Sequence, residues 1–310
     1  MRLRTSISRL FLVAPLALGL LFSACKRTQP PTPSESGLES RGASWKEFDF
    51  APGKTNPEGQ RAIVLQNSNA SDLPLLVALH GRGESGRGLD LGAKAWRDSY
   101  HLDKMYNRLL HPPLLTKDLG EITSLERLKL LNTSLKKDDF QGLTLVCPYT
   151  PDLMSDKSPG ALSDFADFVV SELLPKARSA VGSKAGPEKT GIDGVSLGGR
   201  LALLVGLSRP EAFGSVGALQ PAIRQGEIGM FATMAKQAMD KHPFALRLVS
   251  SEADPFLPAV RALSDRLRQD GVVHELLVVA GHHDYDWNRG PGGAEMLLWH
   301  ERVLRGFRPP

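Results

Sequence analysis

Nucleophilic catalysis by a serine needs a particular local setting, and one short stretch of the sequence provides it. Ser196 stands in Gly194-Val195-Ser196-Leu197-Gly198-Gly199, after a strand-like run and before a helix-like segment. In a nucleophile elbow the serine occupies a strained turn, so the positions two before and two after it must be very small, as Gly194 and Gly198 are. The alternative is a glycine-rich helix start with a capping serine. The order of strand, turn and helix favours Ser196 as a nucleophile.

A serine hydroxyl needs a base to accept its proton, and the base needs an acid to hold it in the right tautomer. Both types follow Ser196 in the chain, each just after a strand-like run. Asp254 follows the first run, with Glu252 as the competing acid. His283 follows the second, with His282 as the alternative. Asp254 could also be a helix cap. Because α/β sheets place their ligands at the carboxyl ends of strands, we predict a triad of Ser196, Asp254 and His283.

The segment His80-Gly81-Arg82-Gly83 directly follows another apolar run. A glycine-rich turn at this place can aim backbone N–H groups at the oxygen that becomes negative during acyl transfer. We expect the N–H groups of Arg82 and Leu197 to form this oxyanion hole, since Leu197 is the residue after the nucleophile. His80 itself is expected to be a structural hydrogen-bonding residue.

Two patterns raise the question of a cofactor or a metal. Gly81-x-Gly83-x-x-Gly86 resembles a dinucleotide-binding loop, but the segment after it opens no apolar helix and no strand ending in an acid follows at the needed distance. The cluster His282-His283-Asp284-x-Asp286 could hold a metal. Adjacent histidines near a strand end point to opposite sides, however, and no helical or hairpin pair completes a ligand set. We therefore predict neither a cofactor nor a metal.

From residue 44 onward, short apolar runs alternate with helical patterns, which is typical of an α/β sheet. The predicted strands are Trp45–Phe50, Arg61–Gln66, Leu73–Leu79, Leu143–Cys147, Thr190–Asp193, Ser215–Leu219, Ala245–Ser250 and Glu275–Ala280. The predicted helices are Leu162–Val181, Leu197–Ser208, Ala259–Gln269 and Ala294–Leu304. We therefore expect a mostly parallel α/β sheet of about eight strands, with helices on both faces and a single domain over residues 44–310.

The stretch 89–142 is too long for a simple connection between two neighbouring strands. Leu125, Leu128, Leu131 and Leu135 recur in it at helical spacing. We predict a helical insert, which could be a lid over a pocket. The insert could equally consist of helices packed on the sheet with no part in binding.

The start of the chain predicts export. Residues 1–24 have a basic beginning and an apolar run Leu10–Phe22, too short for a membrane span, and are typical of a signal peptide. The ending before Cys25 resembles a bacterial lipoprotein signal, which implies lipidation of Cys25 and a membrane-anchored protein of the cell envelope. The alternative is cleavage near Ala24 with Cys25 as an ordinary thiol. Residues 25–43 are rich in Pro, Ser and Gly and are expected to be a flexible tether.

Composition and charge exclude several classes of protein. With 310 residues, 41% hydrophobic and 23% charged, the chain has an ordinary globular composition. Three arginines and no acid lie in residues 1–24, so most of the formal charge of +4 belongs to the signal peptide. A nearly neutral body does not favour nucleic-acid binding. Two cysteines cannot make a disulfide framework, and the apolar setting of Cys147 favours a buried, inert thiol.

With these residues in place, the chain resembles the α/β-hydrolase superfamily over roughly residues 60–308. Within it, the resemblance is to the branch of esterase-D-like, feruloyl and siderophore esterases and mycolyltransferases. The motifs that carry it are His80-Gly81-Arg82-Gly83, Gly194-Val195-Ser196-Leu197-Gly198-Gly199, Asp254, and His283-Asp284 with Trp287 following. That branch often ends with a Gly-Gly-His-x-Trp-like element, and here His282 replaces the second glycine. Because the insert is also longer than the usual connection, the resemblance does not carry over a substrate class.

The resemblance implies a serine hydrolase that cleaves carboxylic esters through an acyl-enzyme intermediate. The substrate would be a small-molecule or polymer-linked ester. An acyltransferase or peptidase on the same fold is one alternative. A non-catalytic binding lipoprotein of the envelope is another, although a scaffold would have no need for all three residue types of a triad.

Overall fold

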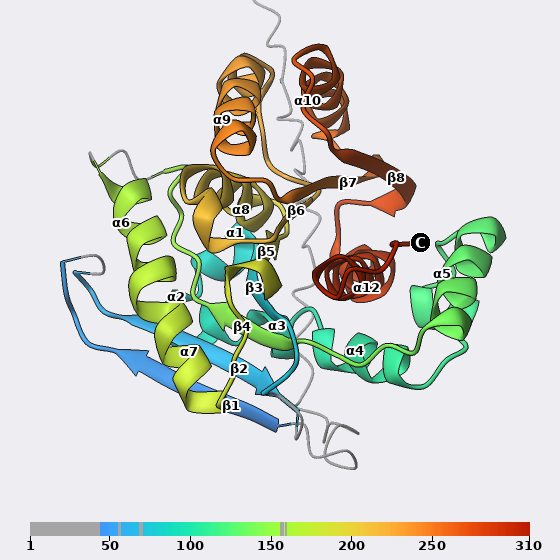
Figure 1. Ribbon diagram of the computed structural model, residues 1–310, viewed down its shortest axis with the longest axis horizontal. Coiled ribbons are helices and arrows are strands. Elements are labelled where there is room, and N and C mark those ends of the chain that lie inside the picture. The colour runs from blue at the N-terminus through green and yellow to red at the C-terminus, as the bar shows by residue number, and fades with distance from the viewer. Residues whose placement is uncertain (1–43, 55–56, 68–70, 156–157, 159) are drawn as a thin grey trace, which may run out of the picture. The chain divides into compact units, whose positions relative to one another are not determined.

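A computed structural model describes residues 44–54, 57–67, 71–155, 158 and 160–310, all within the unit Pro33–Pro310. The predicted signal peptide and tether, with Cys25, lie outside these residues. The described strands form one eight-stranded sheet in the order β1-β2-β4-β3-β5-β6-β7-β8 (Figure 1). The strands are β1 (Ser44–Phe50), β2 (Gln60–Gln66), β3 (Leu75–Leu79), β4 (Thr144–Pro148), β5 (Thr190–Gly194), β6 (Ser215–Leu219), β7 (Ala245–Ala253) and β8 (Glu275–His282).

The sheet is antiparallel at one edge and parallel elsewhere. β1 pairs with β2 and β2 with β4 in antiparallel register, whereas β4, β3, β5, β6, β7 and β8 run parallel. Every residue of β3, β4, β5 and β6 is buried, as expected of central strands that are covered on both faces. The predicted fold class and its strands are confirmed.

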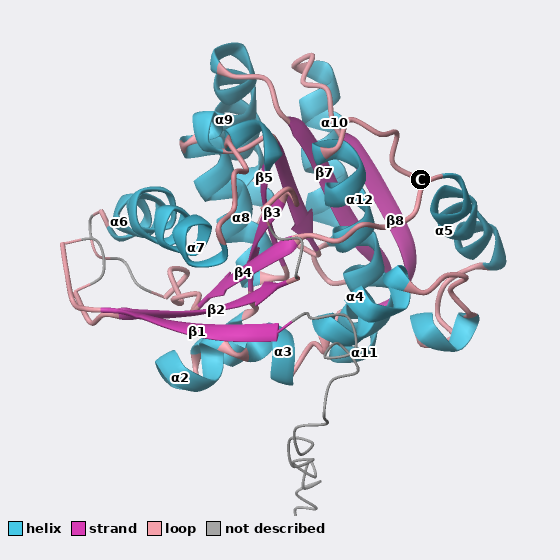
Figure 2. Ribbon diagram, turned by 60° about the horizontal axis from the view of Figure 1, so that its bottom comes forward, coloured by secondary structure: helices cyan, strands magenta, loops and turns pink. Residues whose placement is uncertain are grey.

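Helices cover both faces of this sheet (Figure 2). One face packs against α6 (Ala161–Phe168), α7 (Leu174–Val181), α8 (Leu197–Ser208), α9 (Ile228–Lys241) and α10 (Leu257–Gln269). The other face packs against α3 (Ala95–Asp98), α4 (Leu102–Leu110), α5 (Leu125–Lys137) and α12 (Gly293–Leu304). The sequence predicted α8, α10 and α12, and it predicted α6 and α7 as one helix, but it missed α9.

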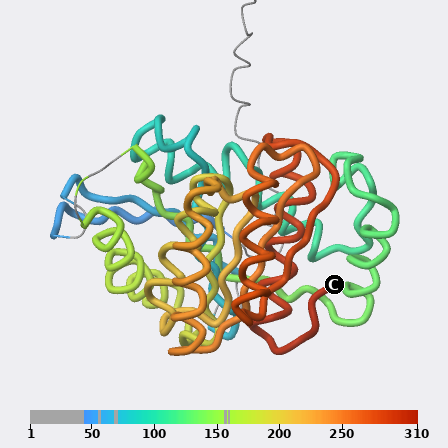
Figure 3. The backbone as a smooth tube through the Cα atoms, turned by 90° about the horizontal axis from the view of Figure 1, so that it is seen from above, coloured from blue at the N-terminus to red at the C-terminus, as the bar shows by residue number. Residues whose placement is uncertain are grey.

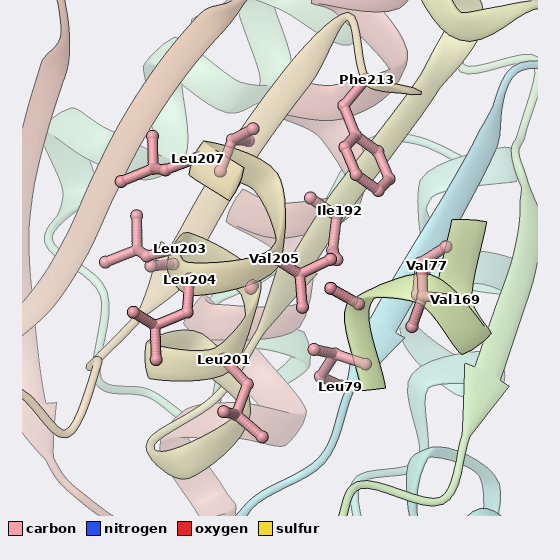
Figure 4. Packing of buried hydrophobic residues seen from close by; sticks show 14 of the residues in the cluster. Val77, Leu79, Val169, Ile192, Leu201, Leu203, Leu204, Val205, Leu207 and Phe213 are labelled. Carbon is pink, nitrogen blue, oxygen red and sulfur yellow. The ribbon is translucent and has the colours of Figure 1, made fainter. Parts of the chain in front are cut away.

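The central helix α8 shows why the first layer is stable. Its sequence is almost wholly apolar, and side chains such as Leu201 and Val205 pack against Val77, Leu79 and Ile192 of the neighbouring strands (Figure 4). Burial of such a side chain contributes roughly 1.5–3 kcal/mol. The helix that follows Ser196 is therefore firmly attached to the sheet, which fixes the position of the turn before it.

The insert 89–142 is helical and most of it packs against the rest of the domain. After the short helices α1 (Arg82–Ser85) and α2 (Gly88–Ala93), it contains α3, α4, the 3-10 helix η2 (Thr116–Leu119) and α5. Arg127 of α5 makes two hydrogen bonds with the buried Glu295 of α12, at 2.7 and 2.6 Å. Arg127 also donates to the carbonyl of Pro310, so the C-terminal end lies beside the insert (Figure 3). These contacts favour the interpretation in which α5 packs against the domain over the one in which it is a lid over a pocket.

No helix among the described residues is long and apolar enough to cross a bilayer.

Candidate active site

The turn between β5 and α8 has the strained backbone of a nucleophile elbow. Ser196 adopts φ 57° and ψ −114°, a region that residues with a side chain rarely occupy. Its N–H donates to Leu219 O at 3.0 Å, and its carbonyl accepts from Ala222 N at 2.9 Å. These bonds anchor the serine to the end of β6, and its side chain stays half-exposed.

The two glycines around Ser196 have no room for a side chain. A β-carbon on Gly194 would lie 2.5 Å from the carbonyl carbon of Gly198. A β-carbon on Gly198 would lie 2.1 Å from Leu79 O, at the end of β3. Because backbone atoms of a central strand cannot move aside, larger residues would push the helix away from the sheet. The small residues that the motif requires are thus explained by the packing.

Asp254 and His283 meet at the carboxyl ends of β7 and β8. The carboxylate oxygen Oδ1 of Asp254 lies 3.0 Å from Nδ1 of His283. The Asp254 side chain is fully buried, whereas 23% of the His283 side chain is exposed. Since a carboxylate only accepts, Nδ1 carries the proton in neutral His283, and the lone pair is on Nε2. This is the tautomer that a general base needs.

The competing residues from the sequence stand apart from this pair. Glu252 and His282 are both exposed, and the structure gives neither side chain a hydrogen bond among the described residues. Asp254 also accepts from the N–H of Phe256, two residues further on, at 3.0 Å, as in an Asx turn. It does not cap the following helix, because the N-cap of α10 is Phe256 and has no side-chain cap bond.

Two buried residues that the sequence did not single out hold the site together. Ser250 of β7 donates to the second carboxylate oxygen of Asp254 at 2.5 Å. Gln220, directly after β6, donates from Nε2 to the carbonyl of His282 at 2.9 Å. Since Leu219 is bound to the N–H of Ser196, Gln220 links the serine turn to the histidine loop. Ser250 is only four residues from Asp254, whereas Gln220 and His282 are 62 residues apart, so no local sequence signal could have found the contact of Gln220.

Ser196 and His283 are not joined by a hydrogen bond in the described part of the chain. Apo structures of hydrolases often have this contact long or misaligned, and it tightens when substrate binds. The structure therefore brings two of the three predicted triad residues into direct contact. It places the third on a turn connected to them through Gln220.

The loop after β3 is held in shape by His80. Its Nδ1 lies 2.9 Å from Gly81 O, and its Nε2 accepts from Thr150 N at 2.8 Å. Full burial lowers the pKa of His80 to about 4, so the ring is neutral near pH 7. A neutral ring with both nitrogens engaged is a structural hydrogen-bonding residue, as the sequence suggested.

The two expected oxyanion donors each begin a helix. Arg82 is the first residue of α1 and Leu197 the first residue of α8. A backbone N–H at the first position has no acceptor within its own helix and is free to bind another group. A β-carbon on Gly81 would lie 3.8 Å from Cβ of Ser196, so this loop and the serine turn are neighbours.

A second set of Ser, His and Asp lies in the core. Ser215 Oγ of β6 is 2.7 Å from Nδ1 of His300 in α12, and Nε2 of His300 is 3.0 Å from Oδ2 of Asp193 in β5. All three residues are buried, with at most 2% exposure. Asp193 also accepts from Gly194 N at 2.6 Å. The sequence did not predict this cluster.

The remaining candidate groups show no site of their own. Cys147 is fully buried, and burial raises the pKa of its thiol well above the usual range, which makes it an inert thiol. No group of three or more His, Cys, Asp or Glu residues in the described ranges is arranged to hold a metal ion.

Three solved structures with a similar fold are an esterase, a serine hydrolase and a second esterase by name. A ferulic acid esterase superposes with a TM-score of 0.63 at 15% identity, covering 84% of this chain and 98% of the other. A fluorophosphonate-binding serine hydrolase of Staphylococcus aureus gives 0.59 at 12% identity, covering 83% and 98%. The enterobactin esterase of Shigella flexneri gives 0.52 at 18% identity, covering 86% and 60%. The chain therefore has the α/β-hydrolase fold.

Sequence comparison finds an esterase match over part of the chain. Residues 154–284 match the family model described as "Putative esterase". The Iron(III) salmochelin esterase of Escherichia coli O6:H1 is 30% identical over 146 residues, which is 42% of this chain. The chain spans about a third of the length of that relative, 36%. The matched family range includes Ser196, Asp254 and His283.

Proposed function

We propose that this chain is a serine esterase that cleaves carboxylic esters through an acyl-enzyme intermediate. Ser196 Oγ attacks the ester carbonyl carbon while His283 Nε2 takes the hydroxyl proton, which it then delivers to the departing alcohol oxygen. A water molecule, deprotonated by the same nitrogen, releases the acid and restores Ser196. Asp254 holds the tautomer of His283 and stabilises the imidazolium that forms in each half-reaction.

The observation that carries this proposal is the contact between His283 and Asp254. Nδ1 of His283 is bonded to the buried carboxylate of Asp254, and Nε2 of this partly exposed ring is therefore available to accept the proton of the Ser196 hydroxyl. The backbone strain at Ser196 supports it, because strain of this kind persists only where the surrounding structure enforces it. The arrangement supports a triad in which each residue lies at the carboxyl end of a different strand.

The N–H groups of Arg82 and Leu197 are the proposed oxyanion hole. Each would donate to the carbonyl oxygen as it becomes negative in the tetrahedral intermediate. Removal of one such donor typically costs a factor of about 100 to 1,000 in turnover. For the substrate we propose a small-molecule or polymer-linked ester, since the names of the relative and of the three similar structures given above refer to esterases or serine hydrolases.

A fluorophosphonate probe tests the proposal directly, because labelling requires an activated serine. The wild-type chain should be labelled and should hydrolyse nitrophenyl esters. Ser196→Ala should lose labelling and most turnover while it keeps its melting temperature, since only a hydroxyl is removed. Ser215→Ala is the matched control, because it removes a buried hydroxyl of the second cluster and should leave labelling in place. Labelling of Ser196→Ala at the wild-type rate would refute the nucleophile assignment.

We also propose that Cys25 carries a lipid anchor in the cell envelope. Each buried CH₂ of an acyl chain contributes about 0.8 kcal/mol, and stable anchoring takes more than one chain. The full chain, expressed in a bacterial host, should partition with membranes, and Cys25→Ser should become soluble. Equal partitioning of both forms would indicate a secreted enzyme without an anchor.

A further inference from the structure

A buried carboxylate that the triad does not use lies beside the serine turn. Glu84 belongs to α1, two residues after Arg82, and only 1% of it is exposed. Its Oε2 accepts from the hydroxyl of Tyr100 at 2.5 Å, and its Oε1 accepts from the hydroxyl of Tyr285. A buried carboxylate is costly unless such bonds compensate it. This one ties α1 to Tyr100, 16 residues further on, and to Tyr285, 201 residues further on.

The first of these bonds continues to the backbone of the proposed oxyanion loop. The oxygen of Tyr100 accepts from the N–H of Gly81 at 3.1 Å. Burial, and after it the Glu84 charge, raise the pKa of Tyr100 well above its usual range, so its hydroxyl keeps its proton. That proton points to Glu84, which can only accept, and the Tyr100 oxygen is therefore left as an acceptor for Gly81. The donor and the acceptor are thus fixed in both hydrogen bonds of this series: Tyr100 donates to Glu84, and Gly81 donates to Tyr100.

The second bond reaches the histidine loop. Tyr285 stands two residues after His283 and begins the short helix α11 (Tyr285–Trp287). Burial, and after it Glu84, raise the pKa of Tyr285 to about 12, so this hydroxyl also stays protonated. Arg87 donates to the Tyr285 oxygen at 3.2 Å and balances part of the Glu84 charge from 3.8 Å. Glu84 therefore bridges the loop after β3 and the loop after β8.

The cluster lies close to the reacting serine. The position of a β-carbon on Gly81 is 2.9 Å from the Tyr100 hydroxyl, 3.4 Å from Oε2 of Glu84 and 3.8 Å from Cβ of Ser196. A shift of the Gly81 peptide would therefore move the next N–H, that of Arg82, relative to Ser196. Small displacements of this kind are costly because oxyanion donors act only within hydrogen-bond distance of the developing charge.

We infer that Glu84 and Tyr100 are positioning residues for the oxyanion hole, an inference that rests on the proposed esterase function. Tyr100 holds the Gly81 peptide from one side, and Glu84 holds the Tyr100 hydroxyl in the one orientation in which its oxygen accepts. Through its bond to Tyr285, Glu84 also holds the proposed oxyanion loop at a fixed distance from the loop that carries His283. Both side chains are buried, so we place their effect on the geometry of the N–H donors.

The test compares an oxygen ester with its thionoester, in which the carbonyl oxygen is replaced by sulfur. N–H donors stabilise a developing oxyanion better than a thiolate-like sulfur, so a well-ordered hole gives a large ratio of the two rates. Tyr100→Phe should lower kcat for the oxygen ester about 10-fold with little change in KM, a smaller loss than deletion of a donor. The oxygen-to-sulfur rate ratio should fall by about the same factor. Glu84→Gln should act in the same direction, because an amide can also donate and no longer fixes the Tyr100 hydroxyl.

Tyr106→Phe is the matched control. Tyr106 is equally buried, and its hydroxyl is bonded to the backbone of Leu143 at 2.9 and 3.0 Å, within the insert and its neighbouring segment. This variant should lower the melting temperature but leave the rate ratio as in the wild type. If the role of Tyr100 were merely structural, Tyr100→Phe would likewise lower the melting temperature and leave the rate ratio unchanged.

The outcomes separate the two claims. If the wild type hydrolyses the oxygen ester and both Tyr100→Phe and Glu84→Gln keep its rate ratio, the positioning role is wrong and the esterase function stands. If the wild type hydrolyses neither ester and no probe labels it, both are wrong. A lower ratio in the two variants, with an unchanged ratio in Tyr106→Phe, supports the inference.

Discussion

Two histidines of this chain each lie 3.0 Å from an aspartate oxygen, and they differ in what their rings leave free. His283 uses Nδ1 for Asp254, and its side chain is 23% exposed. His300 uses Nε2 for Asp193 and Nδ1 for Ser215, and its side chain is fully buried. The buried cluster even has its serine hydroxyl bonded to the histidine. Residue types and hydrogen-bond distances therefore do not distinguish a candidate active site from a packed core.

Access and backbone conformation do distinguish them. No substrate can reach Ser215, which is fully buried in the central strand β6. Ser196 instead occupies a strained turn beyond the carboxyl end of β5 and is partly exposed. Burial lowers the pKa of His300 against the opposing effect of Asp193, so its ring resists the proton that a general base must accept. The buried cluster joins β5, β6 and α12, and its function is to hold these elements together.

The largest difference between the two clusters should appear when His283 and His300 are each replaced by alanine. His283→Ala should lower kcat by several orders of magnitude at little cost in stability, because it deletes the proposed base from a half-exposed position. His300→Ala should instead lower the free energy of unfolding by about 3 to 5 kcal/mol, since it leaves the buried carboxylate of Asp193 without its partner. Turnover per folded molecule and urea unfolding, measured on both variants, check this.

His282→Ala provides the control for the first half of this prediction. Its side chain is exposed, and the structure gives it no bond to Asp254. The variant should keep near wild-type turnover. An inactive, folded His282→Ala beside an active His283→Ala would reverse the assignment of the base.

The buried cluster can also be disturbed without changing any of its residues. A β-carbon on Gly217 in β6 would lie 2.1 Å from Oδ2 of Asp193 and 2.9 Å from Nε2 of His300. Gly217→Ala should therefore lower the free energy of unfolding by about 3 kcal/mol, at the upper end of what overpacking usually costs. Thermal or urea unfolding measures the effect.

Gly229→Ala is the matched substitution at a site with space. No atom lies within 4 Å of a β-carbon on Gly229, which is near the start of α9. Alanine there should leave stability unchanged or raise it by less than about 1 kcal/mol. Equal stability of the two variants would mean that the core around Asp193 is looser than the structure indicates.

The comparison of the candidate active site with the buried cluster also shows what can be predicted from the sequence. The candidates Ser196, Asp254 and His283 could be singled out because each lies at or just after the end of a strand, and parallel strands bring their carboxyl ends to the same side of the sheet. Ser215 and His300 are 85 residues apart and Glu84 and Tyr285 are 201 apart, and their contacts depend on how helices pack on the sheet. Helix α9 was missed since its apolar positions are mostly alanine and methionine, a weak periodic signal.

The last prediction concerns the pH dependence of stability, in which the buried His80 should behave like the buried His300. Both rings are fully buried with both nitrogens engaged, and burial lowers the pKa of each. For His80 the folded pKa is about 4, against 6.5 for the free side chain. Between these values the unfolded chain binds a proton that the folded chain does not. Stability should therefore fall as the pH is lowered from about 6.5 towards 4.

For His80 alone, this difference amounts to about 2 kcal/mol between pH 7 and pH 5. Urea unfolding at the two pH values should show a smaller loss of stability in His80→Gln than in the wild type, by about that amount. The variant is less stable at pH 7, because the bonds to Gly81 and Thr150 are weakened, so the quantity to compare is the change with pH. His242→Gln, at an exposed position, should retain the pH dependence of the wild type. If His80→Gln also retained the wild-type pH dependence, the folded chain would have to protonate His80, and the buried ring could not be the neutral support of the loop after β3.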